Sequence, residues 1–180
     1  MQQYFLAISL GEKISKAIEE ISKKYCGSAG KQPFPHLTIY PPFFVETSEE
    51  DIVEALQSAL VGIAKKTLTL NSIGFFERKN VVYLCPNSDS KKWLGDLASL
   101  SATALQGKMK DVRGKHALYV PHIPLAKRIS EEEFQKIRSQ IARLDPNLSF
   151  NTSSVTLYKW NDASKRWQTA TNITLADPLA

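Results

Sequence analysis

The sequence has few cysteines, few histidines and no long hydrophobic segment. Its 180 residues include only two cysteines, Cys26 and Cys85, and three histidines. Two isolated cysteines do not make a disulfide framework, so a reducing cytoplasm fits best. The N-terminal apolar run from Tyr4 to Ile8 is too short for a signal peptide, because Glu12 and Lys13 soon follow it. No run reaches the length of a membrane span, so we expect no membrane partner.

The composition is that of a globular protein. With 43% hydrophobic and 23% charged residues, the chain can bury a core, and its length predicts one domain or two small fused lobes. The net charge of +5 favours an anionic partner, although many folded domains carry a mild positive excess. A metal-dependent hydrolase is disfavoured, since the chain lacks a cluster of His, Asp and Glu at ligand spacing. No metal and no cofactor are therefore expected.

Two short strings contain two of the three histidines: Pro35-His36-Leu37-Thr38-Ile39 and Pro121-His122-Ile123-Pro124-Leu125. In each string the histidine follows a proline and begins an apolar stretch that is typical of a β-strand. Because side chains alternate along a strand, His36 shares a face with Thr38, and His122 shares a face with Pro124. If the two strands lie side by side, two imidazoles and one hydroxyl line a common groove. Two opposed imidazoles can take a proton from one oxygen and give a proton to another near neutral pH.

The elements around the two histidine strands recur in the same order. Each half has a helix, a histidine strand, a helix with an acidic first turn and then two strands. Thr47 with Glu50, and Ser130 with Glu133, have the spacing of a capping box at the start of a helix. The first histidine strand is expected to end near Pro41-Pro42. This order predicts two similar lobes related by a pseudo-two-fold axis, with the histidines meeting in a groove between them.

The same residues resemble a known family. His36-Leu37-Thr38-Ile39 has the His-x-Thr/Ser-x pattern of the 2H phosphoesterase superfamily, which includes the LigT-like 2′,5′ RNA ligases and cyclic phosphodiesterases. His122-Ile123-Pro124-Leu125 matches the second copy except at its third position. Three further segments look like family features: Phe5-Leu6-Ala7-Ile8, Gly74-Phe75-Phe76 and Val155-Thr156-Leu157-Tyr158.

The resemblance implies a fold and a chemistry. The expected fold is α+β and bilobal, with duplicated antiparallel sheets, flanking helices and a groove between the lobes. We expect one domain over residues 1–180, made of two intertwined lobes at approximately 10–85 and 86–175, with the first strand in one lobe or shared. The implied activity is metal-independent and acts on 2′,3′-cyclic phosphates or 2′-5′ linkages. In that family pattern the two histidines act as acid and base, and the two hydroxyls hold the phosphate.

Pro124 departs from the family pattern. Proline has neither a side-chain hydroxyl nor a backbone N–H, so one phosphate donor of the usual pair is absent. The loss of one such donor costs roughly 10²-fold or more in rate. Lys127 or Arg128 could supply replacement charge, although alternation alone does not place either on the His122 face. Thr38 is then the one hydroxyl expected to bind the phosphate.

Further residues near the two strings are candidates for substrate contact. Tyr40 and Tyr119 could stack on a base, while core packing is the ordinary role of aromatic residues. Lys127 and Arg128 could attract phosphates, while a solvated surface is the ordinary role of such cations. Arg113 and Lys115 belong to the same basic group, and His116 is expected to be exposed.

The sequence therefore supports two hypotheses. The first is a cytoplasmic phosphoesterase, a cyclic phosphodiesterase or 2′-5′ RNA ligase-like enzyme of RNA processing, with His36 and His122 as acid and base. Its partner would be RNA or a nucleotide that carries a cyclic or 2′-5′ phosphate, and no obligate protein partner is evident. The second is a catalytically weak RNA- or nucleotide-binding module of the same fold. Which histidine is the base, and whether hydrolysis or ligation is favoured, stays open.

Overall fold

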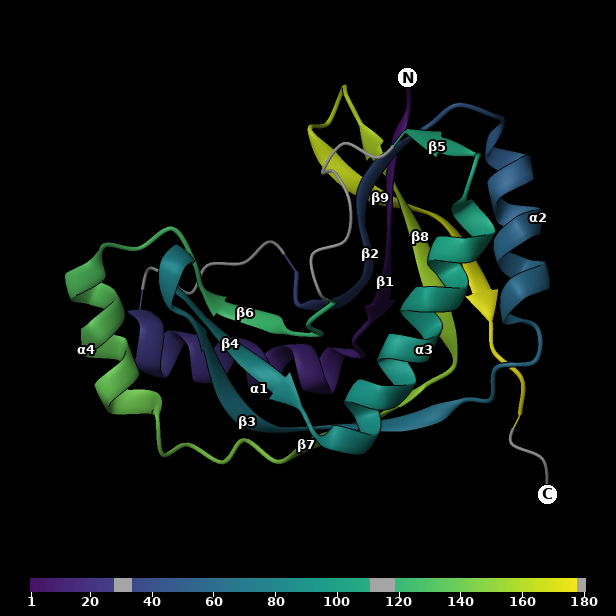
Figure 1. The fold of residues 1–180 in the computed structure, drawn as a ribbon. Helices are drawn as coiled ribbons and strands as arrows, with labels where there is room; N and C mark the ends of the chain where they lie inside the picture. The colour runs from purple at the N-terminus through teal and green to yellow at the C-terminus, as the bar shows by residue number, and fades with distance from the viewer. Residues whose placement is uncertain (28–33, 111–118, 178–180) are drawn as a thin grey trace.

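The computed structural model describes residues 1–27, 34–110 and 119–177 (Figure 1). The strands in these ranges are β1 (Gln3–Ser9), β2 (His36–Val45), β3 (Lys66–Phe76), β4 (Val81–Pro86), β5 (Met109–Lys110), β6 (Ile123–Ala126), β7 (Leu148–Thr152), β8 (Ser154–Asn161) and β9 (Arg166–Thr174). The helices are α1 (Glu12–Cys26), α2 (Glu49–Leu60), α3 (Ser88–Leu105) and α4 (Glu131–Ile141), and a 3-10 turn, η2 (Glu77–Lys79), joins β3 to β4.

The strands form two sheets, and every pairing between named strands is antiparallel. The five-stranded sheet has the order β5-β2-β1-β8-β9, and the four-stranded sheet has the order β6-β4-β3-β7. Helices α2 and α3 pack against the first sheet, while α1 and α4 pack against the second (Figure 1). This architecture confirms the predicted α+β fold with two antiparallel sheets and flanking helices.

Both halves of the chain contribute strands to each sheet. In the first sheet, β2 comes from the range 10–85 and β8 from the range 86–175; in the second sheet, β3 and β6 are divided in the same way. The two ranges are therefore interleaved in space. That the chain makes one domain of two intertwined lobes stays a prediction.

Strand β1 lies inside the five-stranded sheet and is buried on both faces. Five consecutive residues from Tyr4 to Ile8 are buried, as in strands that are covered on both sides. Leu6 belongs to the main core, which lies beneath the helices. Phe5 instead belongs to a smaller aromatic cluster with Tyr158 on the opposite face, next to His36. That opposite face is the one that carries the candidate site.

Strand β2 is longer than the sequence predicted. It continues through Pro41-Pro42 to Val45, so the expectation that it ends near these prolines is wrong. A shift of register between β1 and β2 falls at this point, where Tyr4 pairs with Phe43 but Leu6 pairs with Tyr40. A bulge leaves backbone groups outside the ladder, and it can therefore accommodate residues without an N–H.

The start of α2 also differs by one residue from the prediction. Ser48, not Thr47, is the N-cap: its hydroxyl accepts a hydrogen bond from the Asp51 N–H, and the Asp51 carboxylate accepts one from the Ser48 N–H. The run of acidic residues offers the capping spacing twice, and the structure uses the second. Of the capping box predicted at α4, the structure shows the N-cap bond, in which the Ser130 hydroxyl accepts from the Glu133 N–H.

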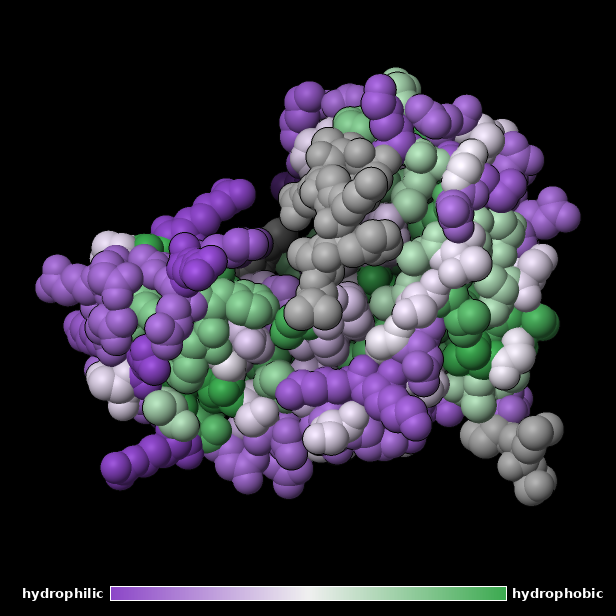
Figure 2. Space-filling view, in the orientation of Figure 1, coloured by the Kyte–Doolittle hydropathy of each residue, from purple (hydrophilic) through white to green (hydrophobic). Residues whose placement is uncertain are grey.

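The hydropathy of the surface differs between the two sides of the view in Figure 2. Hydrophilic residues cover the outer side of α4, whereas hydrophobic residues show around the helices of the five-stranded sheet. Within residues 1–27, 34–110 and 119–177, no helix combines the length and the apolar character needed to cross a membrane.

Candidate active site

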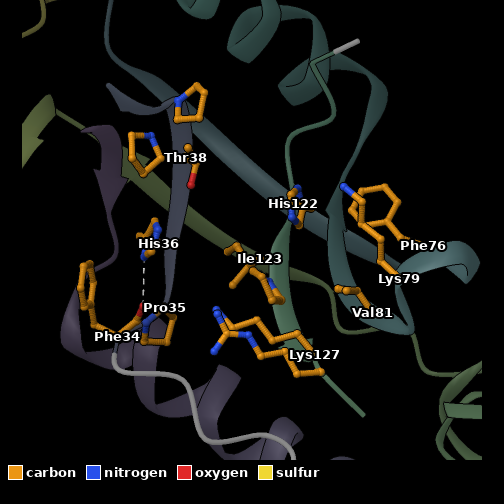
Figure 3. A pocket seen from close by; sticks show the side chains of 14 residues that line it. Phe34, Pro35, His36, Thr38, Phe76, Lys79, Val81, His122, Ile123 and Lys127 are labelled. Atoms are coloured by element: carbon orange, nitrogen blue, oxygen red, sulfur yellow. Dashed lines mark hydrogen bonds between the residues drawn. The ribbon is translucent and has the colours of Figure 1, made fainter. Parts of the chain in front are cut away.

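A cavity of about 590 Å³ brings the two histidine strings together. Its volume lies within the range of roughly 300–1,000 Å³ that is usual for small-molecule sites. His36 and Thr38 reach it from β2, and His122 reaches it from the residue just before β6 (Figure 3). The six lining residues that the sequence had singled out are His36, Thr38, His122, Pro124, Lys127 and Arg128.

The imidazole of His36 is held by one hydrogen bond and two aromatic rings. Its Nδ1 lies 3.0 Å from the carbonyl oxygen of Phe34. The Phe34 ring lies 4.7 Å from the imidazole, and the Phe5 ring lies 5.3 Å from it, measured between centroids. These contacts leave the side chain little freedom to rotate.

The imidazole of His122 is held in the same way by different residues. Its Nδ1 lies 2.7 Å from the carbonyl oxygen of Val120, again two residues earlier in the chain. The Phe76 ring contacts it edge-on at 5.0 Å between centroids, and the Tyr83 ring lies at 5.3 Å. The two histidines therefore have matching local environments on two different sheets.

The two Nδ1 contacts decide which nitrogen can exchange protons. A carbonyl oxygen only accepts hydrogen bonds, so Nδ1 of both His36 and His122 must carry a hydrogen. In the neutral imidazole, Nε2 is then the free acceptor, and it is the atom that can act as base or, once protonated, as acid.

The environment favours the neutral form of both imidazoles. Burial is the main reason that the pKa of His36 is lowered, and the positive charge of Lys127 and the neighbouring His122 add to it. Burial also lowers the pKa of His122, with Lys79 and Lys127 as further causes. Because each Nδ1–H donates to a carbonyl, that bond opposes the shift in both cases. An anion in the cavity would offset these effects by stabilising a protonated imidazole.

Thr38 and Pro124 occupy corresponding places beside the two histidines. Both line the cavity, but only Thr38 has a hydroxyl, and that hydroxyl has no hydrogen-bond partner among the described residues. Pro124 lies in β6, which is the edge strand of its sheet, and the pairing of β6 with β4 shifts register next to it. An edge position with a bulge is where a strand tolerates proline.

Three cations border the cavity among the residues that the structure describes. Lys127 and Arg128 were predicted from the sequence, and Lys79 from the turn η2 was missed. Partial burial lowers the pKa of Lys127, and the charge of Arg128 adds to this effect. Arg128 adopts a positive φ of 60°, which is uncommon for a residue other than glycine. In the sequence Lys79 stands in the polar stretch Arg78-Lys79-Asn80, which is typical of a turn and does not show where its side chain points.

Tyr40 and Tyr119 are not among the described residues that line the cavity. Tyr40 packs against the core, with its ring 5.5 Å from that of Phe43. The Tyr119 hydroxyl donates to the backbone carbonyl of Thr38 at 3.0 Å, so it holds the backbone of β2. Arg113, Lys115 and His116 lie outside the described residues.

Metal ligands do not gather among the described residues of this region. Within the described parts of the chain, no group of three or more His, Cys, Asp or Glu side chains lies where it could hold a metal ion. Cys26 and Cys85 are both buried and free.

Comparisons with known proteins agree with the fold. The chain is 24% identical over 174 residues to the "Putative phosphoesterase" of Staphylococcus aureus strain Mu3. This alignment covers 95% of this chain and 98% of that protein. The structure is similar to E. coli LigT in its apo form, with a TM-score of 0.71, 24% identity and 98% of each chain covered. It is also similar to E. coli LigT complexed with 3′-AMP, with a TM-score of 0.66, 25% identity and coverage of 98% of this chain and 99% of that chain.

A match to a family adds to these similarities. Residues 10–164 match the 2′-5′ RNA ligase superfamily, and this range includes both histidine strings. The chain therefore belongs to the 2′-5′ RNA ligase superfamily.

Proposed function

We propose that this protein is a phosphoesterase that acts on RNA-derived 2′,3′-cyclic or 2′-5′ phosphodiesters. The observation that carries the proposal is the pair of imidazoles, His36 and His122, which line one cavity and are held through matching Nδ1 contacts. Membership of the superfamily supports the same chemistry. That E. coli LigT has been solved in complex with 3′-AMP and with ATP supports a nucleotide as ligand.

The two Nε2 atoms would carry the proton transfers. In hydrolysis, Nε2 of one neutral histidine takes a proton from a water molecule as the water oxygen attacks phosphorus. Nε2 of the other histidine, protonated at the start, gives its proton to the ribose oxygen as the P–O bond breaks. The first histidine ends protonated and the second neutral, so one further proton exchange restores the site. Ligation is the same sequence in reverse.

The remaining lining residues suit a phosphate. The free hydroxyl of Thr38 can donate to a phosphate oxygen, and the ammonium of Lys127 can stabilise the charge that develops on it. Lys127 influences the pKa of both histidines, so it lies near the place where the reacting phosphate would be held. A compensating role for Lys127 would explain why Pro124 can occupy the place of a donor.

A binding module of the same fold is the second candidate. Pro124 favours it, because this residue lines the cavity without a hydroxyl or an N–H to offer the phosphate. Such a protein would hold a nucleotide between His36 and His122 but turn it over slowly.

One experiment separates the two candidates. Hydrolysis of adenosine 2′,3′-cyclic phosphate would be followed by chromatography for wild type, His36→Ala and His122→Ala, with the melting temperature of each variant as the folding control. We expect each substitution to lower turnover by about 10²–10⁴-fold, the usual contribution of a general acid or base. If wild type shows no turnover but binds 3′-AMP in calorimetry, the binding module is correct. If neither turnover nor binding is seen, the site assignment is wrong.

A further inference from the structure

Positive charge around the cavity exceeds what one phosphate needs. The described residues that line it include three cations, Lys79, Lys127 and Arg128, and no Asp or Glu. Within the described part of the chain, none of the three forms an ion pair. A cleft whose charges have one sign concentrates ligands of the opposite sign.

The turn η2 leaves Lys79 available for a ligand. The carboxylate nearest to Lys79 in the turn is that of Glu77, but it pairs with Arg138 of α4 at 2.8 Å. The backbone N–H of Asn80 donates to the Glu77 carbonyl oxygen, and Asn80 adopts a left-handed φ of 48° that closes the turn. Lys79 therefore belongs to a defined turn whose acidic residue is bound elsewhere.

Lys79 and Lys127 serve different parts of the cavity. The positive charge of Lys127 adds to the lowering of the pKa of both His36 and His122, and that of Lys79 adds to the lowering at His122. In Figure 3, Lys79 is seen on the side of His122 that faces away from His36. A phosphate held between the two imidazoles would meet Lys127, and Lys79 would remain for a charge beyond His122.

We propose that Lys79 forms a second phosphate subsite, so that the preferred ligand carries a second phosphate group besides the one between the histidines. This inference rests on the proposed function and narrows its substrate class. The second phosphate could be the internal diester of an RNA strand or the 5′-phosphate of a single nucleotide, and both present the same anionic oxygens to an ammonium group. The cavity volume of about 590 Å³ leaves room for more than one phosphate.

The test compares ligands with and without a second phosphate. Hydrolysis of adenosine 2′,3′-cyclic phosphate is measured beside its 5′-phosphorylated form and beside a diadenosine dinucleotide that ends in a cyclic phosphate. Binding of 3′-AMP and of adenosine 3′,5′-bisphosphate is measured by calorimetry, so that the comparison does not require turnover. The variant is Lys79→Met, and its matched control is Arg78→Met, which removes a cation from the same turn but from a residue that does not line the cavity.

We expect wild type to prefer the ligands with a second phosphate. Lys79→Met should reduce that preference by about tenfold, as the loss of one charge-assisted contact at an exposed position implies. It should also weaken the salt dependence of bisphosphate binding, because one charged contact is lost, while Arg78→Met should keep the wild-type preference. The stronger of the 5′-phosphate and dinucleotide responses identifies the source of the second phosphate.

Two results would overturn the inference while leaving the proposed function in place. One is a wild type that turns over the cyclic mononucleotide but does not favour a second phosphate. The other is a Lys79→Met protein that loses activity or affinity equally for all ligands, which would indicate only a general electrostatic effect. By contrast, turnover that is unaffected by His36→Ala and His122→Ala would contradict the proposed function itself.

Discussion

Replacing Gly74 by alanine should disturb His122 through the ring of Tyr83. Gly74 in β3 pairs directly with Tyr83 in β4. A Cβ added at Gly74 would lie 2.2 Å from Cε2 of the Tyr83 ring, whereas ordinary contacts begin at 3.4 Å. The ring would have to withdraw by about 1.2 Å, the difference between these two distances. It has little room to do so, because Tyr83 is only 8% exposed and its centroid lies 4.3 Å from that of Phe76 and 5.3 Å from that of His122.

The expected cost follows from this overlap. Forcing one extra methyl group into a packed site destabilises a protein by about 1–3 kcal/mol. At about 2–4 °C for each kcal/mol in a chain of this size, the melting temperature of Gly74→Ala should fall by about 2–12 °C. Turnover should fall by about tenfold or more as well, because a displacement of about 1 Å at a catalytic group can cost about 10²-fold.

Calorimetry and turnover of adenosine 2′,3′-cyclic phosphate would measure both effects. Gly95→Ala is the control: Gly95 lies within α3, an added Cβ would meet nothing within 4 Å, and the change should stabilise the helix by roughly 0.5–1 kcal/mol. In a Tyr83→Leu background, which removes the outer ring atoms, the additional cost of Gly74→Ala should largely disappear. A Gly74→Ala protein with the melting temperature and turnover of wild type would refute this account of how His122 is positioned.

Three further predictions concern the chemistry. Thr38→Ala should lower turnover by about 10²-fold, while Thr38→Ser should keep most of it. A Pro124→Thr protein that folds normally should turn over the substrate faster than wild type. Steady-state kinetics test both expectations, and equal rates for Ala and Ser at position 38 would exclude a role for the hydroxyl. Because burial lowers the pKa of both His36 and His122 below the ordinary value of 6.5, the singly protonated pair is most populated on the acid side of that value, so kcat/KM should follow a bell with its maximum below pH 6.5. A bound phosphate raises these pKa values, so the profile of kcat should reach its maximum at higher pH; a rate that climbs steadily with pH would contradict this. Activity should persist in EDTA, and loss in EDTA with recovery on addition of a divalent ion would contradict a mechanism carried by two imidazoles.

Much of the site could be predicted because alternation along a strand is a local property. Leu37 is fully buried on one face of β2, while His36 and Thr38 reach the cavity on the other, as the spacing predicted. The same local rule predicted that His122 and Pro124 share a face. A helix cap depends only on residues three apart, which is why Ser130 was identified correctly. Where the acidic run offered that spacing twice, the sequence did not distinguish Thr47 from Ser48.

Only the tertiary structure decided what meets across the two sheets. The sequence by itself determined which residues share a face, and the family resemblance implied intertwined lobes, but neither determined the order of the strands in each sheet. It did not show that Lys79 reaches the cavity while Tyr40 and Tyr119 do not, or that Gly74 leaves room for the ring beside His122. It also did not show that β2 continues through Pro41-Pro42, which depends on a register shift against β1. The physical reason is that these contacts join residues far apart in the chain, so they depend on how the sheets twist and pack and not on the local spacing of residue types.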